Sequence, residues 1–413
     1  MMNRTLTLLL LSVLLSPHVY SQTDVHLQVD RQRGGRIPIV LNRIEYELPE
    51  SEPFAESISE VLENDLKLTG IFQPVHFREG TDTLKSGLTA VAIFDGKLTR
   101  SSEGYLLDAK LLDYSSRGVI FRKNYRFHAS GCRGVSHNLS DEITYFLVGE
   151  TGIATTSILF VREKQGRKSI YIIDYDGHGL RKLTDDKLAV SPVWLDKNRF
   201  CYTSYKRDNP DCYIVDIKKG LKRLLSYRKG LNIPGGYYSG RDEILMTISV
   251  MGNSELFILD SSGKMQRRLT RNRAIDCSAT WAPNGREIVF VSDRTSVPQI
   301  YIMDRYGGNL RRLTRSGGYS TSPVWSPQGD LISYVSREDG LYRLKLASPD
   351  GLWVDTVYRD YLSYEDPTWA PDGSHLAVTV KYGEESWIVV VNIDSGLKRR
   401  LVRGESPAWS PVR

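Results

Sequence analysis

The sequence predicts a mixed architecture in which a six-bladed, all-β propeller follows a small α/β domain. Three observations carry this prediction. A tryptophan-containing phrase, SPVWSPQGD at 322–330, recurs through the later part of the chain. Four short strand patterns fill each repeat, and the residues before about 150 lack the repeat and mix helix and strand patterns.

The repeat has a nearly constant length. Its tryptophans are separated by 87, 44, 44 and 40 residues, and the first interval is close to twice the second. A degenerate copy is therefore expected near 238, where PGGYYSGRDE places Tyr238 in the tryptophan position. These copies predict six blades. The tryptophans concerned are Trp194, Trp281, Trp325, Trp369 and Trp409.

Each repeat also contains an apolar run, such as EIVFVS at 287, and a phrase such as YIMDRYGGNLRRLT at 301. Together they give four strands in each unit. The first unit begins at ILFV (158) without a tryptophan strand, and the last ends with SPAWSPVR (406–413). The C-terminal strand at 405–411 is therefore expected to pair with 157–161 and close a propeller over 151–413. Within each motif, Ser-Pro is expected to begin a strand and Trp to fill the space between blades.

Residues 37–150 are predicted to form the small α/β domain. A strand pattern begins at 37, and Ser51-Glu52-Pro53 is typical of a helix start. A second helix is expected over roughly 138–148. The apolar faces expected to point inward are Phe54, Ile58, Val61, Leu62 and Leu66 in the first helix and Leu139, Ile143, Phe146 and Leu147 in the second.

Residues 1–21 are typical of a secretory signal peptide, with Arg4 before a short apolar run and small residues before Gln22. A retained anchor is the alternative. No later stretch is apolar enough for a transmembrane segment, so the mature chain is expected to be exported and soluble. Residues 22–36 are polar and are expected to form a flexible N-terminal segment. The net charge of +6 is spread along the chain, which argues against nucleic-acid binding.

The four cysteines are Cys132, Cys201, Cys212 and Cys277, and their spacing is not that of a zinc site. In an oxidising compartment, Cys201 and Cys212 could form a disulfide across one hairpin. Buried free thiols are the alternative.

No motif of a known catalytic centre is present. The sequence has no G-x-S-x-G, no H-E-x-x-H and no P-loop. We therefore expect no catalytic residues, no metal and no cofactor. Two other hypotheses remain: a propeller hydrolase or lyase that acts on envelope glycans or peptides with residues scattered around the channel, and a propeller that binds an unrelated extracellular target.

Several phrases resemble the TolB family. They are YIMD-x-x-GGN-x-RRLT followed by SPVWSPQGD, NDLKLTGIF at 64–72 and FLVGETGIATTSILFV at 146–161. The resemblance implies a periplasmic, non-enzymatic component of the Tol–Pal system, with roles in outer-membrane integrity, envelope constriction during cell division and protein transport. It also implies that the propeller binds the lipoprotein Pal and that the N-terminal segment engages TolA. A monomer is expected.

Two departures limit the resemblance. The second unit is degenerate around 235–240, and QTDVHLQVDRQRGG has no specific match to the family's N-terminal partner-binding segment. The candidate partner-binding residues lie in loops that enter the innermost strands, and ordinary loop structure is the alternative for each. They are Ser191, Cys277, Ser278, Tyr319, Ser320, Thr321, Ser322, Glu365, Asp366, Glu405 and Ser406.

Overall fold

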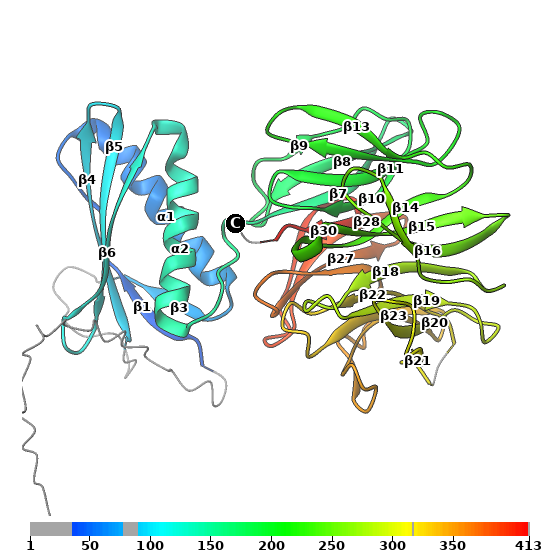
Figure 1. Ribbon diagram of the computed structural model, residues 1–413. Coiled ribbons are helices and arrows are strands. Elements are labelled where there is room, and N and C mark those ends of the chain that lie inside the picture. The colour runs from blue at the N-terminus through cyan, green and yellow to red at the C-terminus, as the bar shows by residue number, and fades with distance from the viewer. Residues whose placement is uncertain (1–34, 77–89, 316–317, 412–413) are drawn as a thin grey trace, which may run out of the picture.

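The computed structural model describes residues 35–76, 90–315 and 318–411, and it shows two packed parts joined by residues 149–156 (Figure 1). The predicted signal peptide and nearly all of the predicted N-terminal segment lie outside the described residues. The predicted fold class is confirmed, since an α/β part precedes six four-stranded sheets. None of the described helices is long and apolar enough to cross a membrane.

The N-terminal part is a mixed sheet with its helices on the side that faces the propeller (Figure 1). The strands at one edge of the sheet run parallel, and the last three form an antiparallel meander. Its strands are β1 (Ile37–Leu41), β2 (Glu45–Tyr46), β3 (Phe72–Val75), β4 (Ala92–Ser101), β5 (Gly104–Asp113) and β6 (Val119–Phe127). Its helices are α1 (Glu52–Leu68), α2 (Cys132–Val148) and the short 3-10 turns η1 (Pro49–Ser51) and η2 (Ala129–Gly131).

Helix α1 buries most of its predicted face, although Phe54 is only partly buried. Ser51 makes no side-chain cap, because the 3-10 turn η1 leads directly into the helix. Helix α2 begins at Cys132, earlier than predicted, and Phe146 is 38 % exposed instead of pointing inward. It lies against Phe121 at a centroid distance of 5.0 Å. The inward face of α2 also includes polar residues, among them His137, which a search for apolar periodicity does not detect.

The propeller consists of six antiparallel blades, numbered here in spatial order. Blade 1 contains β30 (Glu405–Trp409), β7 (Ser157–Lys164), β8 (Arg167–Asp174) and β9 (Arg181–Lys182). Blade 2 contains β10 (Ala189–Trp194), β11 (Arg199–Ser204), β12 (Asp211–Asp216) and β13 (Leu221–Ser226). Blade 3 contains β14 (Asn232–Tyr238), η3 (Ser239–Arg241), β15 (Glu243–Val250), β16 (Asn253–Leu259) and β17 (Met265–Arg268).

The last three blades follow the same order, from the inner strand outward. Blade 4 contains β18 (Asp276–Trp281), β19 (Glu287–Ser292), β20 (Gln299–Asp304) and β21 (Arg311–Arg312). Blade 5 contains β22 (Ser320–Trp325), β23 (Ile332–Glu338), β24 (Leu341–Ala347) and β25 (Val354–Thr356). Blade 6 contains β26 (Ser363–Trp369), β27 (His375–Tyr382), β28 (Glu385–Asn392) and β29 (Lys398–Arg403).

Blade 1 joins the two ends of the propeller. Strand β30 pairs antiparallel with β7, with Trp409 opposite Ile158. The Trp409 indole donates to Thr156 Oγ1 at 2.8 Å, and the Ser410 amide donates to the Ser157 carbonyl at 2.9 Å. The inner strand of this blade therefore comes from the end of the chain.

The repeated tryptophans are buried at blade junctions. The Trp194 indole donates to the Ala408 carbonyl of blade 1 at 2.9 Å, and the Trp369 indole donates to the Val324 carbonyl of blade 5 at 3.2 Å. Trp194 and Trp369 therefore join neighbouring blades by both packing and hydrogen bonding, whereas the buried indole nitrogens of Trp281 and Trp325 have no hydrogen-bond partner.

Blade 3 contains the degenerate repeat at 235–240, which is the second of the repeated phrases in chain order. Tyr238 occupies the tryptophan position and packs on Trp281 with ring centroids 6.0 Å apart. A Cβ on Gly235 would lie 2.2 Å from the Ala279 carbonyl oxygen, and one on Gly236 would lie 3.0 Å from Thr280 Cα. Strand β14 thus approaches β18 closely enough to require glycine at Gly235.

The structure does not contain the predicted disulfide, because Cys201 and Cys212 are both free. Cys201 is opposite Ile214 and Cys212 is opposite Thr203, so the two cysteines are offset diagonally across the hairpin. Both are completely buried in one apolar cluster. Cys132 and Cys277 are free as well.

The two parts of the chain meet through polar contacts. The Tyr175 hydroxyl, in the turn after β8, donates to Asp65 of α1 at 2.7 Å. Asp141 of α2 accepts from the amides of Ala154 and Thr155 at 2.7 and 3.1 Å, which holds the connecting segment against the helix. Gly152 is needed here, because a Cβ would lie 2.5 Å from Asp141 Cα.

Replacing Trp409 by Ala should destabilise the propeller by about 3–5 kcal/mol, since it removes a buried indole from the closing strand. Trp353→Ala is the matched control, because Trp353 is 47 % exposed whereas Trp409 is 5 % exposed. Denaturant unfolding of both variants provides the measurement. Equal stability of the two variants would contradict a structural role for the closing strand.

Gly235→Ala should destabilise the protein by roughly 1–3 kcal/mol, because the added methyl group collides with the backbone of β18. Gly134→Ala in α2 makes the control, since a Cβ there meets nothing within 4 Å. The control should be neutral or stabilising by up to about 1 kcal/mol, because alanine favours the helix. Thermal unfolding would distinguish them, and two unchanged midpoints would disprove the close approach at β14.

Candidate functional site

The six innermost strands form a ring around the propeller axis. Each contacts the inner strand of the next blade, and the contact between β10 and β30 completes the circle. Each inner strand also has a register shift in its pairing, so two residues leave the regular ladder.

The residue at this bulge has a left-handed backbone in five of the six blades. The φ angles of these residues lie between 49° and 54°. Proline follows four of them, and its missing N–H is tolerated because the bulge is unpaired. The Ser-Pro pair therefore forms a bulge within the strand, and the prediction that it begins the strand is wrong. The left-handed residues are Ser191, Ser278, Ser322, Asp366 and Ser406.

Asp366 connects three consecutive inner strands. Its two carboxylate oxygens accept hydrogen bonds from Ser322 Oγ at 3.3 Å and from Ser406 Oγ at 3.0 Å. Burial raises the pKa of Asp366, and the two serine bonds partly oppose that shift. The structure thus brings three of the predicted residues together at the axis.

Other predicted residues lie around this contact. Glu365 pairs with Lys381 at 2.7 Å, and Glu405 pairs with Lys168. Tyr319 is exposed and packs edge-on against Tyr342, with ring centroids 6.4 Å apart. The remaining residues differ in exposure: Ser278 is exposed, Ser191, Cys277 and Thr321 are half-buried, and Ser320 is fully buried.

Ser320 is therefore a poor choice for a surface contact. Its side chain lies 3.4 Å from Ser336 Oγ on the adjacent strand. Residue spacing placed Ser320 near the end of an inner strand, but it could not show that this side chain points into the blade.

The predicted residues lie near the starts of the inner strands, at the end of the propeller away from the N-terminal part. The connecting segment enters β7 at Ser157, which pairs with Asp174 and bonds to Ser410 at the other end of the blade. Figure 1 shows the helices of the N-terminal part on that side. We call the opposite end, formed by the loops before the inner strands and between the second and third strands, the loop face.

The loop face carries exposed apolar side chains that the sequence analysis did not select. They occur in loops of blades 3 to 6, where they do not follow a strand or helix period. An apolar residue next to glycine or arginine in a predicted loop, as in VMGN and RNRAI, is the only sequence signal. These residues are Tyr227, Met251, Ile275, Val297 and Tyr361, in addition to Tyr319.

Exposed basic residues lie in the loops of this face, together with exposed acidic residues that include Asp185, Asp208, Asp339 and Glu384. Glu365, Asp366 and Glu405 lie near the axis. A face with exposed aromatic, Met and Ile side chains among cations is suited to binding a protein surface. The exposed basic residues are Lys206, Arg207, Lys229, Arg271, Arg273, Arg315 and Arg337.

Comparison with known proteins agrees with this architecture. The Tol-Pal system protein TolB of Legionella pneumophila (strain Corby) is 25 % identical over 246 residues, which cover 56 % of each chain. A TolB homolog of Chlorobaculum tepidum is 29 % identical over 266 residues, which cover 60 % of each chain. The chain thus matches little more than half the length of these curated relatives.

A solved structure extends the likeness to both parts of the fold. TolB from Acinetobacter baumannii superimposes with a TM-score of 0.79 at 23 % identity and covers 92 % of this chain and 98 % of its own. The family model described as the TolB beta propeller domain matches residues 145–413. Because that match covers more than half of the chain, the protein belongs to the TolB β-propeller family.

Proposed function

We propose that this protein is a periplasmic interaction scaffold of the Tol–Pal envelope system, and that its loop face binds a Pal-type peptidoglycan-associated lipoprotein. The observation that carries the proposal is the set of exposed apolar side chains on the loop face, away from the N-terminal part. The names of the relatives, which include Tol-Pal system proteins, favour this class of partner.

The chemistry of the loop face supports a protein partner. Met251, Ile275 and Tyr319 can act as anchors, since large apolar side chains near the centre of an interface supply much of its binding energy. The surrounding basic side chains favour an acidic partner surface, because complementary charge accelerates encounter.

The arrangement of the axis argues against the alternative of a hydrolase or lyase. Glu365 and Glu405 are held in ion pairs, and both oxygens of Asp366 accept hydrogen bonds from serines. These carboxylates stabilise the ring, and no histidine contributes to it among the described residues.

Within this proposal, the scaffold would contribute to outer-membrane integrity and to constriction of the envelope during division. A TolA-type inner-membrane protein is proposed as a second partner, through the segment 22–36. This segment falls almost entirely outside the described residues, so support for this half comes from the family resemblance alone.

The double variant Met251→Ala/Ile275→Ala should weaken binding of the soluble domain of a Pal-type lipoprotein from the same organism by tenfold or more. The expected loss is about 1–2 kcal/mol for each anchor. Leu352→Ala is the matched control, because Leu352 is as exposed but lies in the turn between β24 and β25, at the other end of the blade. Calorimetric titration of purified proteins measures the effect. Absence of binding by the wild type, or equal loss in the control, would contradict the proposal.

Association should slow as salt is added, because the basic side chains of the loop face attract an acidic partner at long range. Arg271→Glu/Arg273→Glu should reduce the association rate by roughly tenfold at low salt and leave the dissociation rate nearly unchanged. Arg122→Glu, an exposed site on β6, serves as the control. Surface plasmon resonance at two salt concentrations separates the rates, and a rate insensitive to salt would refute electrostatic steering.

A further inference from the structure

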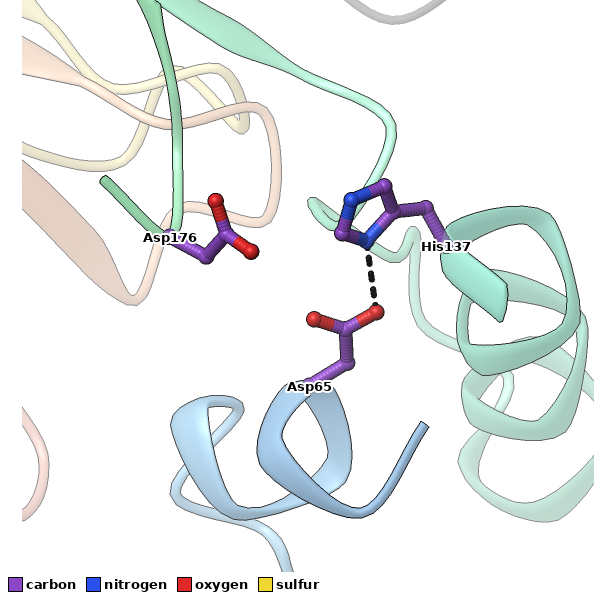
Figure 2. A group of neighbouring side chains, drawn as sticks. All are labelled: Asp65, His137 and Asp176. Atoms are coloured by element: carbon purple, nitrogen blue, oxygen red, sulfur yellow. Dashed lines mark hydrogen bonds and ion pairs between the residues drawn. The ribbon is translucent and has the colours of Figure 1, made fainter. Parts of the chain in front are cut away.

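A buried polar cluster lies where α1, α2 and the propeller meet. Asp65 belongs to α1, His137 to α2 and Asp176 to the turn after β8 (Figure 2). One nitrogen or oxygen atom from each of the three side chains lies within 4.8 Å of the others. Three segments far apart in the sequence therefore direct their side chains to one point.

One ring nitrogen of His137 has no partner. His137 Nδ1 bonds to Asp65 Oδ2 at 2.6 Å, whereas Nε2 is buried without a hydrogen bond. The residue is 7 % exposed, and Figure 2 shows this second nitrogen on the side of the ring that faces Asp176. A buried nitrogen left unsatisfied costs free energy, so it calls for a ligand.

A second buried histidine shows what a satisfied pair looks like. His375 Nδ1 bonds to Asp372 Oδ2 at 2.5 Å, and its Nε2 interacts with the Asn392 side-chain amide at 3.0 Å. Both ring nitrogens of His375 thus have partners. His137 also has a carboxylate on Nδ1, that of Asp65, but its Nε2 lacks a partner.

The charge at the junction is negative. Four carboxylates, those of Asp65, Asp141, Asp174 and Asp176, interact electrostatically there, and two guanidinium groups, those of Arg133 and Arg399, oppose them. When these six groups are ionised and His137 and His178 are neutral, four negative and two positive charges leave −2.

We propose that His137 Nε2 and the Asp176 carboxylate form a binding site for a divalent transition-metal cation of the zinc class at the domain junction, with Asp65 holding the His137 ring from the second sphere. An imidazole with carboxylates suits such ions, whereas magnesium and calcium prefer oxygen ligands alone. The Asp65 contact to Nδ1 fixes the ring so that Nε2 faces the ion, as second-sphere carboxylates do for metal-binding histidines.

The existing contacts of Asp176 are compatible with a metal. Its oxygens accept from the His178 amide at 3.1 Å and from Arg133, and its carboxylate retains further lone pairs. The nearby His178 ring, 3.4 Å from Asp176 Oδ2, could supply a further ligand.

Such a metal would join the two parts of the chain, since His137 lies on α2 and Asp176 lies in the propeller. Its binding should therefore stabilise this junction and not only a local turn. The site lies at the opposite end of the propeller from the loop face, so this inference is independent of the proposed partner.

The test uses untagged, full-length mature protein that has been freed of metal with a chelator. Calorimetry with Zn²⁺ should show one saturable site per chain, and Co²⁺ should give a visible ligand-field absorption band. Asp176→Asn and His137→Gln should each weaken binding by about tenfold or more and remove the band. His76→Ala is the control, because His76 is an exposed histidine paired with Glu63 elsewhere.

Circular dichroism tests whether the variants are folded. If His137→Gln does not fold, Asp176→Asn still tests the proposal, because Asp176 lies in a turn. Zn²⁺ should also raise the thermal midpoint of the wild type but not of Asp176→Asn. Failure of the wild type to bind, binding lost in His76→Ala, or binding unchanged in Asp176→Asn would each overturn the proposal.

Discussion

The pairing of β30 with β7 is the constraint on which the propeller depends, because a ring of sheets has no free ends only when its first and last elements meet. The pairing places residues from opposite ends of the propeller in one blade. Thr156 and Ser157, at the end of the connecting segment, bond to Trp409 and Ser410. The same contacts that close the ring therefore also fix where the N-terminal part attaches.

The bulges of the inner strands determine the chemistry at the axis. A left-handed backbone conformation is energetically costly for residues other than glycine. Because it recurs at the same position in five blades, the geometry is imposed by the ring. At this position in blade 6, Asp366 replaces serine and connects two neighbouring strands. A residue in a structural role thus contributes a carboxylate at the centre, while the loops outside it carry charged and apolar side chains.

The two ends of the propeller consequently differ in chemical character. The end toward the N-terminal part is polar and buried, and it holds the His137 cluster among carboxylates and two arginines. The loop face is exposed and suited to a partner. A stiff ring between them lets each end be built from loops without disturbing the other, because the blades rather than the loops supply the core.

Repeat spacing determined the number of blades, the degenerate third blade and the strand left without a partner at each end, because these features are periodic and local in the sequence. Periodicity also located the helices of the N-terminal part, but not the start of α2 or the outward position of Phe146. Only the tertiary structure decided that Ser320 is buried, that Cys201 and Cys212 are offset, and that Met251 and Ile275 share one face. It alone brought Asp65, His137 and Asp176 together, because contacts between residues so distant in the chain depend on how the blades and helices pack and leave no pattern in their local sequence.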